Sequence, residues 1–436
     1  MTSKANKICA AALMLSLSVL AVPFYLHAAE VVTLEQAIDI ALKKNPFLVA
    51  SRSEVDAARA RVTQAAASYY PQVSASAGYD HTSNDTDSGS LDTNDSVDNY
   101  AAGLSVSQFI YDFGKTPAQV EKSSQSLEST QNNLKTVNKT LVKDVKQSYF
   151  EALKNQQLVN VGEEALDVRR KHLEQSRALY KVGMRPRIDV TRGEVEVSQA
   201  KLRLVIARYG LRRSIITLEK LLGGPPKSGA YVLAEENPSS QTPPELRLLI
   251  DLAREQRSEL TALKAQIKAA EADLVSAKRS AYPSLNARGS YNYSGDDSPL
   301  DHELDHRWQV GISLNWPLFT GYRQTGQVSE SEANVKRLNA LYENQILSVI
   351  EEVTRDYLTV HEAEETIKTA ETALRQAQEN LDMAEGRYKT GVSDSIELSD
   401  AQVLYTESRS SLVQAAYEHH KALAGLEFAV GGQLGI

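Results

Sequence analysis

The sequence predicts an α+β protein that is built twice from one unit of two strands and a very long helix. Residues 41–67 resemble residues 253–279 at a shift of 212 positions, and later motifs repeat at a shift of 208. Alternating apolar and polar residues predict two strands in each copy. A stretch of about sixty residues with almost no helix-breaking residue predicts one long helix in each copy.

The composition excludes several classes of protein. The chain has 48 Lys plus Arg against 56 Asp plus Glu, a net charge of −8. A general nucleic-acid-binding protein is therefore not expected, because neutralising phosphates requires concentrated Lys and Arg. The fractions of hydrophobic residues, 42%, and charged residues, 24%, are those of a folded protein rather than a disordered one. One cysteine builds neither a disulfide framework nor a cysteine-based zinc site, and we expect no cofactor.

The first 29 residues have the layout of a secretory signal peptide. Two lysines precede an apolar run from Ile8 to Leu26, and Ala28 and Ala29 follow it. We expect cleavage after one of these alanines. An uncleaved anchor helix is the alternative, which the short run and its Pro23 disfavour. Beyond this run no stretch of 18 apolar residues occurs, so a membrane crossing by the mature chain requires β-strands.

The mature chain is expected to contain two copies of one unit and a linker. We predict a signal peptide at 1–29, a first copy at 30–224, a linker at 225–244 and a second copy at 245–436. The linker region is rich in Gly and Pro, a composition that stops helices. Each copy is expected to run helix, strand, loop, strand, very long helix, tight turn and return helix.

The predicted strands are each about ten residues long. In the second copy the apolar face is the clearest, with Leu285, Ala287, Tyr291 and Tyr293, then Trp308, Val310, Ile312, Leu314 and Trp316. The first copy repeats the pattern more weakly over 72–79 and 100–107. A tilted strand of about ten residues crosses a bilayer, and Tyr and Trp are typical of its interfaces. A soluble hairpin with one face on a core is the alternative, and composition alone leaves both interpretations open.

The predicted helices favour the membrane interpretation. Only Gly162 interrupts the stretch from Ala118 to Lys181, and Gln327 to Glu385 contains neither Pro nor Gly. At 1.5 Å per residue each helix reaches on the order of 90 to 100 Å, whereas the mean globular helix has about 11 to 12 residues. Apolar residues recur at threes and fours, as in a coiled coil. Return helices are expected at Ile188–Leu222 and Ile396–Ala429, and other copies of the chain are expected to cover the rest.

The strands and helices together require an assembly of several chains. The smallest transmembrane barrels have eight strands, and open sheet edges are not tolerated in lipid. Four strands therefore cannot close a barrel, so we expect several chains to share one barrel above a tube of helices.

Four short motifs recur in a fixed order around the long helices: Tyr180-Lys-Val-Gly, Trp316-Pro-Leu-Phe, Tyr388-Lys-Thr-Gly and Leu426-Glu-Phe-Ala-Val-Gly-Gly. With the duplication, they resemble the TolC-type outer-membrane efflux and secretion channels of Gram-negative bacteria, the outer membrane factors. The resemblance covers essentially the whole mature chain. It implies a homotrimer in the outer membrane, in which four transmembrane strands per chain form a 12-stranded β-barrel continued by a long periplasmic α-helical barrel.

The resemblance also implies a function. Such a channel is the exit duct of a tripartite efflux or type I secretion system, and its partners are a periplasmic adaptor, an inner-membrane transporter and outer-membrane lipid. It catalyses no reaction, so no catalytic residues are expected. The alternative from another class is a secreted coiled-coil structural protein or adhesin without transport activity.

The resemblance places adaptor-docking tips at the turns between the long and return helices. The residues implied are Tyr180, Val182, Gly183, Tyr388, Gly391 and Val392. Gly suits such helix ends because it tolerates a positive φ. A plain helix–helix turn is the alternative.

Just past the second turn, Glu397 and Asp400 align with two acidic residues that line the closed entrance in the family. They are three residues apart, so they share a helix face. Threefold symmetry would place six carboxylates around the axis, a ring that attracts cations. A solvated acidic face is the alternative.

The family holds its entrance shut with bonds between an Asp, a Tyr and an Arg. Asp189 and Tyr388 match the first two, and Ser393 stands at the Arg position. The Arg part of the latch is therefore absent or rebuilt here, with Arg185 or Arg187 as candidate substitutes, while Asp189 and Tyr388 remain the implied latch residues.

Three further segments resemble functional motifs but are interpreted as chance matches. His302-Glu-Leu-Asp-His matches a zinc-protease pattern but lies in a loop between strands, where its His residues share no helix face. Aspartates over 85–98 lack the Gly and Glu of a calcium loop and are expected in an exposed loop. Gly223-Gly-Pro-Pro-Lys-Ser follows a helix and is interpreted as a helix stop rather than a phosphate loop. No metal-binding residues are expected.

Overall fold

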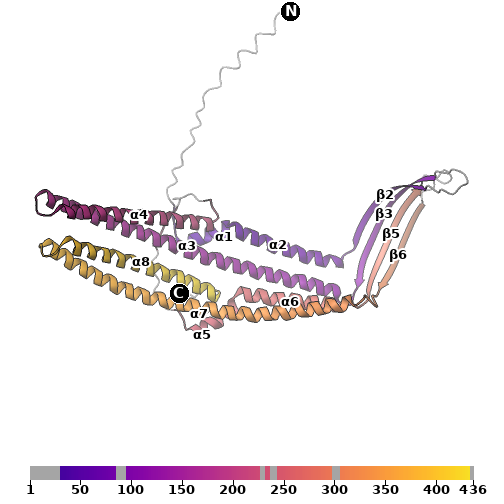
Figure 1. Cartoon of the computed structure of the whole chain (residues 1–436). Helices are drawn as coiled ribbons and strands as arrows, with labels where there is room; N and C mark the ends of the chain where they lie inside the picture. Colours follow the sequence, from indigo (N-terminus) through magenta and orange to yellow (C-terminus); the bar gives the residue numbers. More distant parts are fainter. Residues whose placement is uncertain (1–29, 85–94, 226–230, 236–242, 297–304, 433–436) are drawn as a thin grey trace, which may run out of the picture.

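The computed structural model describes residues 30–84, 95–225, 231–235, 243–296 and 305–432. The predicted signal peptide lies outside these residues, as do the first three residues of the His302 motif and the tip of the acidic loop. The molecule is elongated, with a β-sheet at one end and two helical hairpins at the other (Figure 1).

The two long helices confirm the prediction from the sequence. Helix α3 spans Lys115–Lys181 and helix α7 spans Arg323–Lys389, each with 67 residues. At 1.5 Å per residue, each is about 100 Å long. The return helices are α4, Arg187–Leu221, and α8, Ser395–Val430. Because they have 35 and 36 residues, they cover only the half of each long helix that ends in the turn.

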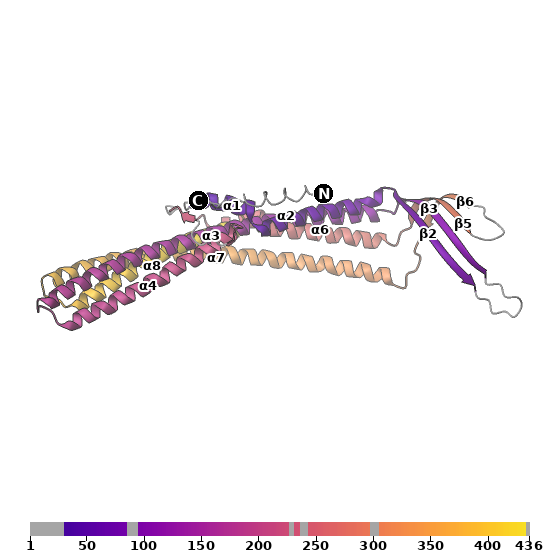
Figure 2. The same ribbon diagram turned by 90° about the horizontal axis from the view of Figure 1, so that it is seen from above.

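The other half of each long helix packs against a helix that precedes the strands. Helix α2, Pro46–Ala66, contacts α3, and α6, Ser258–Arg279, contacts both α3 and α7. Figure 2 shows the resulting change of partners near the middle of the molecule, where α3 and α7 pass from one set of neighbours to the other.

The single helix predicted at the start of each copy is in fact two helices. In the first copy α1, Leu34–Lys44, is separated from α2 by Asn45. Asn45 has an extended backbone because Pro46 disfavours the helical conformation in the residue before it. The Asn45 side chain then caps α2 by accepting a 2.9 Å hydrogen bond from the amide of Phe47. In the second copy α5, Leu246–Gln256, also ends at an extended residue, Arg257, but Ser258 follows it and the Arg257 side chain does not cap α6.

A two-stranded parallel sheet was missed by the prediction. Strand β1, Glu30–Val32, pairs with β4, Tyr231–Leu233, which lies within the segment predicted as a linker. The sheet is anchored by buried Tyr149 of α3. Its hydroxyl lies 2.9 Å from the carbonyl of Val32 and 2.8 Å from that of Ala234, and donates to one at a time.

The large sheet contains one strand pair from each copy. Strands β2, Gln72–Asn84, and β3, Asp95–Tyr111, join β5, Ser284–Asp296, and β6, Asp305–Asn315, in the order β2-β3-β5-β6. All neighbours are antiparallel, and the two copies meet at the β3–β5 pair. The prediction of an α+β fold with four strands and long helices is confirmed.

Two details of the strand prediction were wrong. Asp98, which was expected in an exposed loop, lies within β3 because that strand continues outward to Asp95. Its carboxylate accepts a hydrogen bond from Tyr79 and lies 2.6 Å from the His81 ring. At the other end, β6 stops at Asn315, so Trp316 lies beyond the strand and donates instead to the carbonyl of Ala281.

Equivalent residues of the two copies form two separate hydrophobic cores. Val145 and Leu218 are buried in the first core, and Val353 and Leu426, 208 positions later, are buried in the second. Both cores lie where α1 or α5 crosses the long helix. The duplication seen in the sequence is thus a duplication of packing.

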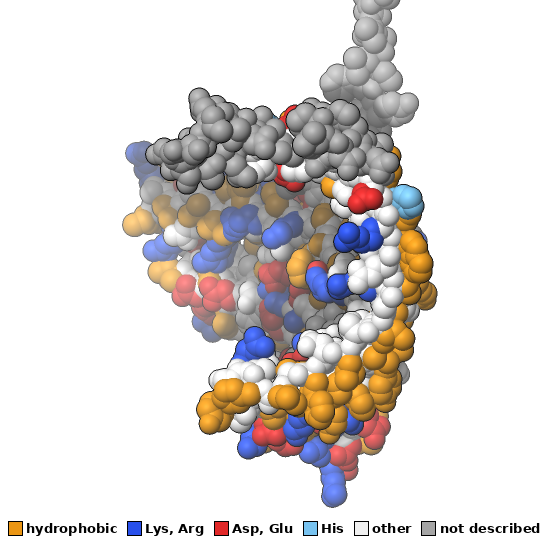
Figure 3. Space-filling view, turned by 90° about the vertical axis from the view of Figure 1, so that its right-hand side faces the viewer, with side chains coloured by type: hydrophobic (Ala, Val, Ile, Leu, Met, Phe, Trp, Pro, Cys, Tyr) orange, Lys and Arg blue, Asp and Glu red, His pale blue; other side chains and the backbone are white. Residues whose placement is uncertain are grey.

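The sheet is apolar on one face and polar on the other. Trp308, Val310, Ile312 and Leu314 project from the same face of β6 and are all exposed. Figure 3 shows apolar side chains along the outer, convex edge and polar ones on the hollowed side. Within the described part of the chain, none of the helices carries an apolar stretch long enough to span a bilayer.

Candidate functional site

The tips of the two hairpins lie close together at the end opposite the sheet (Figure 1). The α3–α4 turn contains Gly183 at φ +78°, and the α7–α8 turn contains Gly391 at φ +77°. In the first turn Met184 donates a 2.9 Å hydrogen bond to the carbonyl of Leu179, and in the second Val392 donates at 3.0 Å to Arg387. These are the bonds of a helix terminus with a left-handed residue, a conformation that favours Gly.

The tips expose apolar side chains to solvent. Val182 and Val392 are exposed, as the sequence led us to expect, and Val392 reaches 72%. Met184 occupies the position equivalent to Val392 and is equally exposed, although sequence reasoning missed it. The sequence could have revealed it, because Met184 is an apolar residue in a turn, 208 positions before Val392.

Tyr388 is the one predicted tip residue that is buried, at 7% exposure. Its ring lies 5.5 Å from the ring of His172 on α3, and the Arg185 guanidinium lies 5.3 Å from its centroid. The other predicted latch residue, Asp189, accepts a 3.2 Å hydrogen bond from the Ser395 hydroxyl. The structure therefore gives Asp189 and Tyr388 separate partners, and each links the first hairpin to the second.

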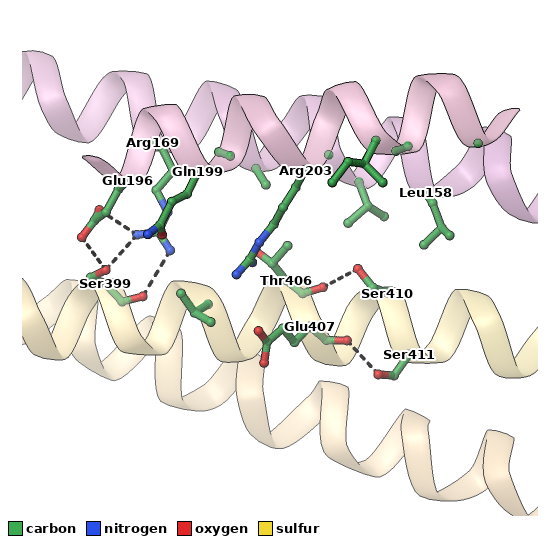
Figure 4. Close-up of a pocket in the computed structure, with 18 of the residues that line it drawn as sticks. Leu158, Arg169, Glu196, Gln199, Arg203, Ser399, Thr406, Glu407, Ser410 and Ser411 are labelled. Carbon is green, nitrogen blue, oxygen red and sulfur yellow. Dashed lines mark hydrogen bonds and ion pairs between the residues drawn. The ribbon is translucent and has the colours of Figure 1, made fainter. Parts of the chain in front are cut away.

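A buried polar network ties the hairpins together three turns above the tips (Figure 4). Arg169 of α3, 8% exposed, donates to Glu196 of α4 at 3.1 Å and to Gln402 of α8 at 2.6 Å. It also donates to the hydroxyl and carbonyl of Ser399, each at 3.2 Å. The Ser399 hydroxyl donates in turn to Glu196 at 2.6 Å. Burial lowers the pKa of the Arg169 guanidinium, and the Glu196 carboxylate opposes that shift.

An open groove of about 1010 Å³ extends from this network between α3, α4 and α8. Its charged lining residues are Arg169, Arg192, Glu196, Arg203, Arg213, Asp400 and Glu407. Figure 4 shows Arg203 reaching from α4 across the groove toward α8.

The predicted acidic residues lie at the start of α8. Glu397 is in the first turn and Asp400 one turn later, both exposed, and they share a shallow depression with Asp394. The Asp394 side chain caps the helix by accepting hydrogen bonds from the amides of Ile396 and Glu397. Arg387 lies 3.3 Å from Glu397. Both carboxylates are thus open to solvent on one side of the second hairpin.

A duplicated chain that carries membrane-length strands on helices about 100 Å long is built as the subunit of an outer-membrane channel. A family model described as "Outer membrane efflux protein" matches residues 37–224 and 249–432. The chain belongs to the outer membrane efflux protein family.

Individual relatives agree with this family. The chain is 25% identical over 405 residues to "Pyoverdine export outer membrane protein OpmQ" of Pseudomonas aeruginosa, covering 92% of this chain and 85% of the relative. It is 23% identical over 396 residues to "Outer membrane protein TolC" of Vibrio cholerae, covering 90% and 89%. The solved structure of the channel protein CusC superposes with a TM-score of 0.80 at 19% identity, over 92% of both chains.

The family establishes the class of function. The protein is an outer-membrane efflux channel of the Gram-negative type, with a large periplasmic helical portion. Its family consists of channels rather than enzymes. The alternative of a secreted coiled-coil protein without transport activity is wrong, because the family match covers both copies of the unit, strands included.

Proposed function

We propose that three copies of this chain form the exit duct of a tripartite efflux or type I secretion system. The duct receives substrates from an inner-membrane transporter and passes them across the periplasm and the outer membrane. One observation supports the proposal: within the described residues, the sheet has one apolar face and its two outer strands each pair on one side only, while the long helices beneath it are only partly covered.

The sheet requires further strands. In the described part of the sheet, β2 and β6 each pair on one side only. Backbone groups along an open edge find no hydrogen-bond partner in lipid, at a cost of several kcal/mol for each group. Three copies, with four strands each, supply twelve strands and leave no edge, as the family resemblance implies.

The helices require further partners too. Val195, Leu202 and Ile206 project from α4 into solvent in the single chain, and Leu347 and Leu358 project from α7. Apolar side chains exposed at helical spacing along one element are typical of a surface that another chain covers. Neighbouring copies in a helical tube cover such faces and bury the charged groove between the hairpins.

The tips are assigned to adaptor docking. Val182, Met184 and Val392 present apolar side chains at the far end of the molecule, on turns fixed by Gly183 and Gly391. We assign Tyr180 to the same surface, since it is half-exposed at the end of α3. A periplasmic adaptor with an apolar helical tip fits this surface, and an inner-membrane transporter completes the assembly.

The entrance is assigned to Glu397 and Asp400. In a trimer they contribute six carboxylates, which attract cations and disfavour anions. Asp189 and Tyr388 hold the second hairpin against the first through Ser395 and Arg185, and so serve as the latch. OpmQ is named for pyoverdine export, so a small exported molecule is the first cargo to test.

Two measurements test the proposal. The full-length protein, purified in mild detergent, is expected to be a trimer and to conduct ions in a planar lipid bilayer. The variant Glu397→Gln with Asp400→Asn is expected to weaken block of single channels by multivalent cations.

Glu54→Gln with Asp56→Asn removes two exposed carboxylates from α2, far from the tips, and should leave the block unchanged. A monomer that never conducts would refute the duct. If multivalent cations block the Glu397/Asp400 variant as strongly as the wild type, the carboxylate ring is refuted but the duct is not.

A further inference from the structure

The polar face of the large sheet carries two arginines from the second copy. In the β5–β6 register Arg288 faces Gly311, and Asn292 faces Arg307. Between these two pairs, Gly289–Val310 and Tyr291–Trp308 belong to the apolar face. Since successive residues of a strand point to opposite sides, Arg288 and Arg307 lie on the same, polar face.

This polar face is the hollowed side of the molecule. Figure 3 shows Lys and Arg side chains within the hollow, with some Asp and Glu among uncharged surface, while apolar side chains follow the convex edge. In an outer-membrane channel the apolar face contacts lipid. The face with Arg288 and Arg307 therefore lines the water-filled interior.

The cross-strand neighbours of both arginines on this face are uncharged. Arg288 lies between Ser107 of β3 and Gly311 of β6 in the register. Arg307 lies beside Asn292, whose other neighbour is Gly103. Both side chains are exposed, and within the described residues neither has an ion-pair partner. Their charge is therefore available to solutes in the lumen.

The acidic side chains on this face lie nearer the outer end of the strands. Asp305 is two residues before Arg307 on β6, so its carboxylate offsets part of the positive potential of Arg307. Asp80 faces Asn99 near the end of β2. Arg288 is four positions deeper along β5 than Asn292, about 14 Å at 3.4 Å per residue. At 0.15 M salt the Debye length is about 8 Å, so these carboxylates screen little of the positive charge of Arg288.

We propose that Arg288 and Arg307 form a cationic belt inside the strand portion of the duct, which binds organic anions on their way out. This inference rests on the proposed trimer, in which the belt contains six guanidinium groups. The planar fork of a guanidinium pairs with two oxygens at once, so the favoured solutes carry carboxylate, phosphate or sulfate groups. The belt lies about one long helix, roughly 100 Å, from the acidic entrance, and the two act independently.

The belt is tested in the full-length channel with the charge-removing variant Arg288→Gln/Arg307→Gln. In bilayers under a KCl gradient near 0.01 M, this variant should raise the permeability ratio of cation to anion by about twofold or more. The difference should shrink at 1 M salt, where the Debye length falls from about 30 Å to 3 Å. Citrate added on the strand side should block wild-type current and block the variant less.

Two matched variants separate charge from folding. Arg288→Lys/Arg307→Lys keeps the charge and should keep the wild-type permeability ratio. Arg61→Gln removes an exposed arginine of α2 and should change neither readout. The belt proposal would be overturned if the Gln variant kept both the wild-type permeability ratio and the wild-type citrate block. It would also be overturned if the Lys variant lost both the permeability ratio and the citrate block. If a variant gives either of these results but still forms a conducting trimer, the proposal of an exit duct stands. A wild-type chain that never conducts would refute both the duct and the belt.

Discussion

Arg169 of α3 and Gln402 of α8 are joined by a 2.6 Å hydrogen bond although 233 residues separate them in the chain. The same guanidinium pairs with Glu196 of α4. One buried side chain therefore joins three of the four helices that form the hairpins. Since the turns are a few helical turns away, we expect this contact to limit how far the second hairpin moves from the first.

Replacing Arg169 with Met should loosen the hairpins. The Glu196 carboxylate, whose side chain is 13% exposed, would lose its cation, at a cost of about 3 to 5 kcal/mol for a broken buried pair. We expect faster hydrogen exchange over the first turns of α8 and more frequent opening of reconstituted channels. Arg177→Met is the control, because its pair with Glu194 is half-exposed and worth about 0 to 1 kcal/mol. Equal exchange in the two variants would contradict the role given to Arg169.

Replacing Gly391 with Val should distort the α7–α8 turn. An added Cβ meets no atom within 4 Å, so the cost comes from the positive φ, about 1 to 2 kcal/mol. Export should fall while trimers persist, as measured by transport assay and native electrophoresis. Gly386→Ala, inside α7 with no atom nearby, should leave export unchanged. Normal export in Gly391→Val would argue against docking at this tip.

Replacing Tyr149 with Phe should loosen the small parallel sheet. The change removes the hydroxyl that lies between the carbonyls of Val32 and Ala234. The Val32 carbonyl keeps its 3.2 Å hydrogen bond from the Ala234 amide, so the loss is that of one hydrogen bond, about 0.5 to 1.5 kcal/mol. Thermal unfolding should occur at a lower temperature. Tyr357→Phe alters the equivalent, half-buried tyrosine of the second copy and should have a smaller effect. Similar shifts in the two variants would contradict the bridging role.

The hairpin contact at His172 should weaken in acid. Burial lowers the pKa of His172 below its usual value of about 6.5, with Arg169 adding to the shift while Glu196 and Asp189 oppose it. The unfolded chain then binds more protons than the folded chain, so stability rises with pH. This contribution is complete above about pH 6.5 and is lost as pH falls through the lower, folded pKa.

His172→Phe keeps an aromatic ring against Tyr388 and removes the titration. The difference in unfolding temperature between pH 7.5 and pH 5.5 should therefore be smaller in this variant than in the wild type. An unchanged difference would show that other groups govern the pH response.

The elements that the sequence predicted correctly are those set by local pattern. Sixty residues without Pro or Gly, and strict alternation around Trp308 to Leu314, need no knowledge of distant contacts. The break at Asn45 was also present in the sequence, since Pro46 restricts the residue before it. It was missed because the apolar periodicity continues on both sides of the break.

The features that were missed depend on contacts between residues far apart in the chain. Strand β4 has three residues within a Pro-rich segment, and it forms only because Val32 and Tyr149 meet it. The Arg169 network combines residues from three helices, and no spacing in the sequence brings Glu196 to Ser399. Gly183 and Gly391 lie in the turns, and Glu397 and Asp400 lie at the start of α8, because helix ends can be located from local sequence. The roles assigned to these residues stay predictions.

Each long helix changes its neighbours at mid-length, where the return helix stops and α2 or α6 takes over. The two halves of the helix therefore pack against different elements, and we expect any tilting of the hairpins to bend the chain at this level. Such a bend would widen the end of the conduit at the turns without moving the sheet.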